Sequence, residues 1–288
     1  MGDSQRKPRW WSGGVCSAIA VTTTHPLDLV KVQLQTAVDK APVSVIVSNI
    51  FKKAGILGFY SGISASWFRQ LTYTTTRFAL YEWGKQFVDA NNVSAKVQLA
   101  TFAGIVGGIV GVPGDVVTVR LQNDIKMPPE KRRGYKHVFD GLYRIQKEEG
   151  VRSLFRGTVP AVTRAVLLTI GTNAAYDQVK QILKGTIELK DGLPLHFLTS
   201  SIAGCIGTLL TQPIDVIKTR YMNAKPGEFS GIGAVVVSIA KQGPFAFYKG
   251  FIPALLRVSP NTIITFMLYE QARIRFGYLP EEEKKKSS

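Results

Sequence analysis

Six stretches of the chain are predominantly apolar, and more polar segments separate them. They are residues 10–35, 64–88, 96–122, 159–183, 194–222 and 251–276. Each is long enough to cross a bilayer as a helix, which takes about 20 residues. Every stretch also contains charged residues, which are costly in lipid and should therefore face a protein interior or an aqueous cavity. The pattern predicts an all-α membrane protein whose six transmembrane helices surround a central route.

The stretches form pairs within a unit that occurs three times. The first apolar stretch of each unit contains a proline followed two residues later by an acid, at Pro26, Pro113 and Pro213. An aromatic residue and an acid, with a base three residues further on, close each unit. In every unit a glycine precedes this acid by 20 residues, at Gly62, Gly157 and Gly250. Because three ordered matches with one constant offset leave chance little room, we expect a repeat architecture.

The repeats define the expected domain organisation. We place repeat 1 at residues 10–90, repeat 2 at 95–186 and repeat 3 at 193–277, between an N-terminal tail (1–9) and a charged C-terminal tail (278–288). Between the paired helices, segments near residues 43–53, 136–147 and 231–241 mix polar and apolar positions. They are typical of short interfacial helices. The basic loop 126–136 favours anionic lipid as its neighbour.

Net charge narrows the choice of partner. The chain has 36 Lys and Arg against 20 Asp and Glu, a formal charge of +16, which suggests an anionic partner. A basic nucleic-acid-binding protein is one alternative, but no recognition motif for nucleic acid appears and the charge is dispersed through apolar stretches. His25, His137 and His196 are scattered, without a catalytic or metal-binding motif around them. We therefore expect no enzyme, no cofactor and no nucleic-acid partner.

The three copies of both motifs resemble those of the mitochondrial carrier family, over residues 10–276. The resemblance implies a threefold pseudosymmetric barrel of six transmembrane helices, with a short matrix-side helix in each repeat and both termini on the cytosolic side. It implies an antiporter of the inner mitochondrial membrane that works by alternating access. A cardiolipin-like lipid at the matrix side and function as a monomer are further expectations.

The same resemblance assigns two gates. The matrix gate comprises Asp28, Lys31, Asp115, Thr118, Asp215 and Lys218, with Gln35 and Gln122 as braces. The expected cytoplasmic pairs are Glu82 with Lys180, Asp177 with Arg273, and Glu270 with Lys85. Thr118 departs from the family pattern because it replaces a base and leaves Asp28 facing a neutral side chain. We therefore expect two ion pairs in the closed matrix gate against three in the cytoplasmic gate, and a preference of the unliganded protein for the matrix-open state.

Three bases share one repeat position: Arg69, Arg164 and Arg257. Guanidinium groups bind carboxylate and phosphate through two parallel hydrogen bonds, so three around one axis suit a compact ligand with two anionic ends. Further candidate substrate-binding residues are Gln70, Arg77 and Asn261, of which the last two bind substrate or pair with a helix carbonyl.

Finer stretches resemble the dicarboxylate-exchanging members of the family, among them Ser64-Ala65-Ser66, Gln122-Asn123-Asp124 and Tyr221-Met222-Asn223. This resemblance implies exchange of malate or succinate for phosphate or a sulfur oxyanion. Oxoglutarate–malate exchange and a proton leak of the uncoupling type remain alternatives within the family.

Overall fold

The computed structural model describes residues 11–37, 42–88, 93–128, 130, 132–187, 193–225 and 227–277, and all regular structure among them is helical. The long helices are α1 (Ser12–Gln35), α3 (Ile63–Gly84), α4 (Val93–Asp124), α7 (Thr158–Ile187), α8 (Leu193–Asn223) and α10 (Phe251–Phe276). They coincide with the six predicted stretches to within a few residues at each end. Trp10 and the two predicted tails lie outside the described residues.

The long helices close into a ring. α1 packs against α3 and α10, α4 packs against α3 and α7, and α8 packs against α7 and α10. Pro26, Pro113 and Pro213 lie inside α1, α4 and α8, where each removes one backbone hydrogen bond. The predicted threefold barrel is confirmed.

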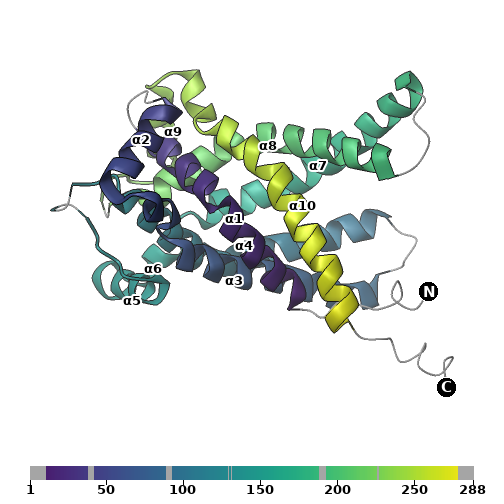
Figure 1. Ribbon diagram of the computed structural model, residues 1–288, viewed down its shortest axis with the longest axis horizontal. Helices are drawn as coiled ribbons and strands as arrows, with labels where there is room; N and C mark the ends of the chain where they lie inside the picture. The colour runs from purple at the N-terminus through teal and green to yellow at the C-terminus, as the bar shows by residue number, and fades with distance from the viewer. Residues whose placement is uncertain are drawn as a thin grey trace.

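Short helices cover one end of the barrel. They are α2 (Val43–Ala54), α5 (Val138–Glu149) and α9 (Ile232–Ala240), at the places predicted. Each is followed by a shorter turn of helix that was not predicted: η2 (Ile56–Tyr60), α6 (Val151–Leu154) and η5 (Pro244–Tyr248). Figure 1 shows α2, α5, α6 and α9 at one end of the molecule, with the start of α1 and the end of α10 at the other. We call the first end the matrix end.

Small residues bring α3 and α4 close together. A Cβ added at Gly107 would lie 3.0 Å from the carbonyl oxygen of Tyr73, and one at Gly114 would lie 3.2 Å from the Cα of Arg69. Such close approach of backbones is the usual role of small residues between membrane helices. It also fixes the height of Arg69 relative to Asp115, the neighbour of Gly114.

By length and composition, three helical segments could cross a membrane: Ser94–Asp124, Leu198–Asn223 and Pro244–Phe276. A fourth is the bent pair Val43–Ala54 and Ile56–Phe87, if its two parts form one span. The other predicted spans are less apolar, because polar residues such as the run 22–25 in α1 lower their mean hydropathy. Large apolar side chains are exposed on the long helices, including Trp67, Phe102, Ile170, Leu210 and Met267.

Arginines of repeat 2 join this repeat to the end of α8. Arg120 Nε donates to the carbonyl oxygen of Met222 at 3.2 Å. Arg133 and Arg156 donate to the next two carbonyl oxygens along the chain, at 2.7 and 3.2 Å. The last turn of a helix leaves carbonyl oxygens without intrahelical partners, so these cations satisfy them. Part of the charge in the basic loop 126–136 is therefore used inside the protein, not toward lipid.

Candidate functional site

A cavity of about 590 Å³ lies inside the ring, with walls from α1, α3, α7, α8 and α10. Its lining includes all six residues predicted to bind substrate: Arg69, Gln70, Arg77, Arg164, Arg257 and Asn261. They come from α3, α7 and α10, one helix of each repeat. The volume falls in the range usual for small-molecule sites.

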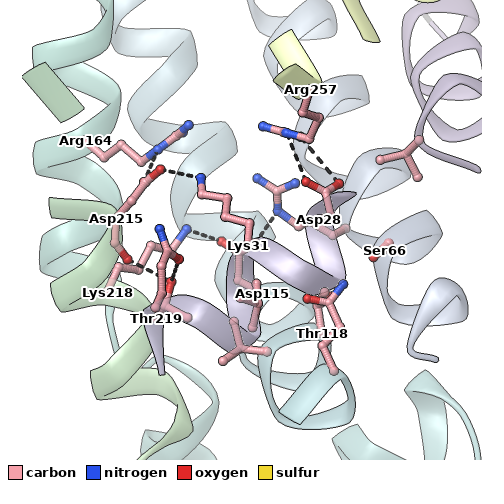
Figure 2. A pocket seen from close by; sticks show the side chains of 16 residues that line it. Asp28, Lys31, Ser66, Asp115, Thr118, Arg164, Asp215, Lys218, Thr219 and Arg257 are labelled. Atoms are coloured by element: carbon pink, nitrogen blue, oxygen red, sulfur yellow. Dashed lines mark hydrogen bonds and ion pairs between the residues drawn. The ribbon is translucent and has the colours of Figure 1, made fainter. Parts of the chain in front are cut away.

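Toward the matrix end, the cavity floor is a layer of ion pairs (Figure 2). We define the ion-pair layer as Asp28, Lys31, Asp115, Asp215 and Lys218, together with the three symmetry-related arginines. Lys31 Nζ lies 2.8 Å from Asp215 Oδ2, and Lys218 Nζ lies 2.5 Å from Asp115 Oδ2. Both contacts join different repeats, as the sequence predicted.

The third acid of the layer has a partner that the sequence did not predict. Asp28 Oδ1 lies 2.9 Å from Arg257 Nε. Thr118, expected to face Asp28, donates its hydroxyl to the carbonyl oxygen of Gly114 in its own helix, at 2.7 Å. Because Arg257 supplies the missing charge, the expectation of only two ion pairs at this end is wrong. The preference for a matrix-open state that was based on that count loses its premise.

The other two symmetry-related arginines also contact acids of the layer. Arg69 forms an ion pair with Asp115, and Arg164 forms one with Asp215. Each arginine is thus both part of the cavity wall and a partner of a floor carboxylate. Each of these contacts joins an arginine of one repeat to the acid of the next repeat. The repeat itself was the available signal in the sequence, because a contact made between two repeats is expected between the other pairs as well.

The two predicted glutamine braces line the smaller cavity within and below the layer. Gln35 accepts a hydrogen bond from the Thr219 hydroxyl at 2.8 Å. The side-chain oxygen of Gln122 is buried without a partner among the described residues. Among the residues that the structure describes, neither glutamine donates a hydrogen bond to a charged side chain of the layer. The bracing role therefore stays a prediction.

At the opposite end of the barrel, ion pairs form within helices. Lys85 Nζ lies 2.7 Å from Glu82 in α3, and Arg273 lies 2.5 Å from Glu270 in α10. Neither base reaches the acid expected for it on a neighbouring helix, Glu270 for Lys85 and Asp177 for Arg273. Asp177 and Lys180 lie one turn apart on α7. Among the described residues, the pairs of the ion-pair layer therefore join different helices, whereas Glu82–Lys85 and Glu270–Arg273 form between residues three positions apart.

Arg77 lies on the cavity wall outside the ion-pair layer. It forms no ion pair among the described residues, and its only hydrogen bond there is a long one of 3.5 Å to the Tyr73 hydroxyl. The Tyr73 ring also lies under the Arg69 guanidinium, 5.9 Å away. Sequence analysis did not single out Tyr73 as a site residue, because an aromatic residue in an apolar helix carries no signal of this contact.

The two polar amides of the cavity have their oxygens occupied. Gln70 Oε1 accepts from the Thr74 hydroxyl at 3.1 Å, and Asn261 Oδ1 accepts from the Thr24 hydroxyl at 3.4 Å. An amide whose oxygen is occupied has its NH2 group left to donate. Both residues can therefore offer hydrogen-bond donors to an anion.

Comparison with known proteins shows the same threefold organisation. A family described as Mitochondrial carrier protein matches the chain at residues 8–92, 89–186 and 190–278. A mitochondrial dicarboxylate carrier of Caenorhabditis elegans is 50% identical over 281 residues, covering 96% of this chain and 97% of the relative. The mitochondrial citrate transporter F of Aspergillus niger is 40% identical over 271 residues, 91% of this chain and 87% of the relative. A mitochondrial 2-oxoglutarate/malate carrier protein of Sus scrofa is 36% identical over 283 residues, 93% and 83% of the two chains.

Proposed function

The chain belongs to the mitochondrial carrier family of multi-pass transporters in the inner mitochondrial membrane, and on this premise we propose that it exchanges dicarboxylates such as malate and succinate for phosphate or a sulfur oxyanion. The relative with 50% identity, a dicarboxylate carrier, supports this choice of substrate. The net charge of +16 is consistent with an anionic cargo.

One observation carries the proposal: three arginines, one from each repeat, meet carboxylates at the floor of one cavity. Arg69, Arg164 and Arg257 each already hold an aspartate carboxylate. Guanidinium groups in such positions can bind the carboxylate or phosphate oxygens of a ligand in the same way. A compact dianion can engage two of them at once, whereas a monoanion can satisfy only one end of the site.

The remaining cavity residues complete the proposed site. The NH2 groups of Gln70 and Asn261 donate to substrate oxygens, because their own oxygens are occupied. Arg77, which has no carboxylate partner among the described residues, attracts the anion on its way to the three arginines. Its position eight residues after Arg69 places it about 12 Å further from the matrix end, at about 1.5 Å per residue of helix.

The same arginines give a physical basis for exchange. Substrate oxygens compete with Asp28, Asp115 and Asp215 for the guanidinium groups, so binding weakens the ion-pair layer that closes the matrix end. When this end opens, Lys85 and Arg273 give up their ion pairs with the acids three residues before them. They then pair with Glu270 and Asp177 on neighbouring helices, which closes the other end. Without substrate the layer keeps its ion pairs, so net movement without a counter-substrate is suppressed.

We extend the proposal to the surroundings of the carrier. The cavity and its floor come from a single chain, so a monomer suffices for transport. Anionic, cardiolipin-like lipid contacts the matrix end, where exposed Lys52 and Lys53 of α2 stand beside exposed Phe51. Such pairing of basic and apolar side chains is typical of segments at a lipid surface.

Binding tests the proposed site without any assay of transport. Succinate, malate and phosphate should raise the unfolding temperature of the purified protein in detergent, because a ligand at 100 times its Kd stabilises by about 2.7 kcal/mol. Acetate, with one carboxylate, should stabilise far less. Oxoglutarate is included because the Sus scrofa relative favours oxoglutarate–malate exchange as the second candidate. Equal effects of acetate and succinate would contradict a site built for two anionic ends.

A further inference from the structure

The three acids of the ion-pair layer are not equivalent. Two of them each contact a lysine and an arginine: Asp115 contacts Lys218 and Arg69, and Asp215 contacts Lys31 and Arg164. Asp28 contacts Arg257 alone among the described residues. The cause is Thr118, which occupies the repeat position held by lysine in the other two repeats.

The single contact of Asp28 is also a loose one. Arg257 Nε lies 2.9 Å from Oδ1 without an aligned hydrogen bond, and the hydrogen bond from Nη1 to Oδ2 is 3.5 Å long. The lysine contacts of Asp215 and Asp115 are 2.8 and 2.5 Å. Figure 2 shows Arg257 directed at Asp28, whereas Arg164 and Lys31 both point to Asp215.

We propose that Arg257 couples substrate binding to the opening of the matrix end, a task that Arg69 and Arg164 do not share. This inference rests on the proposed function of the cavity. When substrate takes Arg69 or Arg164, the acid left behind keeps its lysine. When substrate takes Arg257, Asp28 is left in a largely buried place with no cation in contact among the described residues, which strongly disfavours the closed layer.

The inference predicts that the three arginines differ when each is neutralised in the absence of substrate. Cavity exposure is read from a cysteine at Thr208, a small residue of the cavity wall, with Cys16 and Cys205 replaced by serine. A membrane-impermeant thiol reagent is applied to the cytosolic face in mitoplasts and to the matrix face in inverted inner-membrane vesicles. The ratio of matrix-side to cytosolic-side labelling reports which end is open.

Arg257→Gln should raise this ratio about fivefold or more, the shift expected when one stabilising contact of the closed state is lost. Arg69→Gln and Arg164→Gln should change it less than twofold, because Lys218 and Lys31 remain. Equal shifts for all three variants would overturn the inference, and so would no shift for Arg257→Gln.

Two rescues keep the test decisive if Arg257→Gln is poorly folded. Adding Thr118→Lys to Arg257→Gln gives Asp28 a cation of its own and should return the ratio to that of the parent. Thr118→Met, similar in length but neutral, should not. Adding Asp28→Asn removes the unpaired charge and should also restore the parent ratio. Rescue by methionine as well as by lysine, or failure of both lysine and Asp28→Asn to rescue, would contradict the inference.

The labelling result separates this inference from the proposed function. It is obtained without substrate, so it reports on the ion-pair layer even in a protein that carries another anion. A chain that fails to bind dicarboxylates yet shows the Arg257-specific shift would overturn the proposed substrate alone. Dicarboxylate exchange combined with equal behaviour of the three arginines would overturn the coupling role alone.

Discussion

Arg120 donates from Nη1 and Nη2 to the two carboxylate oxygens of Glu149, at 2.6 and 2.8 Å, while its side chain is wholly inaccessible to solvent. The third donor, Nε, reaches the carbonyl oxygen of Met222. One side chain therefore ties α4 to both α5 and α8, which belong to different repeats. A bidentate pair of this kind fixes orientation as well as distance, and so holds the matrix end of repeat 2 against repeat 3.

Glu149→Gln should destabilise the protein by about 3 kcal/mol, because it leaves Arg120 buried without a counter-charge. The matched control is Glu148→Gln, which removes a neighbouring but exposed pair with Arg144 and should cost about 1 kcal/mol or less. Thermal unfolding of both variants in detergent measures the difference. Equal losses would show that burial of the Arg120 pair adds nothing.

The same pair predicts a dependence of stability on pH. Burial raises the pKa of Glu149, but the hydrogen bonds and charge of Arg120 outweigh this and hold it below its ordinary value of 4.5. A lowered pKa in the folded state means that the stabilisation is present above the ordinary value and is lost as pH falls through the folded value. The difference in unfolding temperature between the parent and Glu149→Gln should therefore be constant above pH 4.5 and shrink below it. A difference that grows on acidification would contradict the assignment.

Arg164→Ala should reduce dicarboxylate exchange by about a hundredfold, since it removes two charge-assisted hydrogen bonds of about 1.5 kcal/mol each. Arg164→Lys should also be poor, because an ammonium group cannot form the two parallel bonds. Arg152→Ala, at an exposed position of α6, is the control and should exchange normally. Initial rates in proteoliposomes decide, and a near-parental rate for Arg164→Ala would remove this arginine from the site.

Arg77→Gln should raise the KM for succinate about tenfold and change the maximal rate much less. Arg77 lies outside the ion-pair layer, so its loss weakens attraction of the anion but leaves the moving parts intact. Loss of binding that is equal in the ground and transition states raises KM alone. A lower maximal rate at unchanged KM would instead assign Arg77 to the conformational step.

The long helices were predictable because their signals are local. The number of apolar stretches long enough to cross a bilayer predicted the number of helices. The recurring proline and acid predicted that the helices form three repeats. The short helices α2, α5 and α9 were predicted for the same reason. Their sharp ends depend on Gly55, Gly150 and Gly243, whose φ values of 63°, 85° and 98° are left-handed and easy only for glycine. The sequence shows these glycines, but it gives no signal for the turn of helix that follows each of them.

The contacts of the site were less predictable than its members. All six predicted binding residues line one cavity. The threefold repeat places the three equivalent arginines at one height, and the other three residues lie on two of the same helices, α3 and α10. The partner of Asp28 was missed because a sequence shows that Thr118 is neutral, yet not that Arg257 is long enough to reach the vacant acid. Hydrogen bonds from Arg120 and Arg133 to backbone carbonyl oxygens were missed because every residue carries that acceptor, so it leaves no mark in the sequence.

The central claim is that this chain exchanges compact dianions through the three-arginine cavity, and counter-exchange by the purified protein in liposomes tests it most directly. Liposomes loaded with malate are given labelled succinate, malate, phosphate, thiosulfate, oxoglutarate, citrate or acetate, and uptake is compared with that into liposomes without internal substrate. The account predicts rapid uptake of the first four anions, dependent on internal malate and reduced about a hundredfold by Arg164→Ala. Uptake that does not require internal malate, or that prefers citrate or oxoglutarate over succinate, would contradict it.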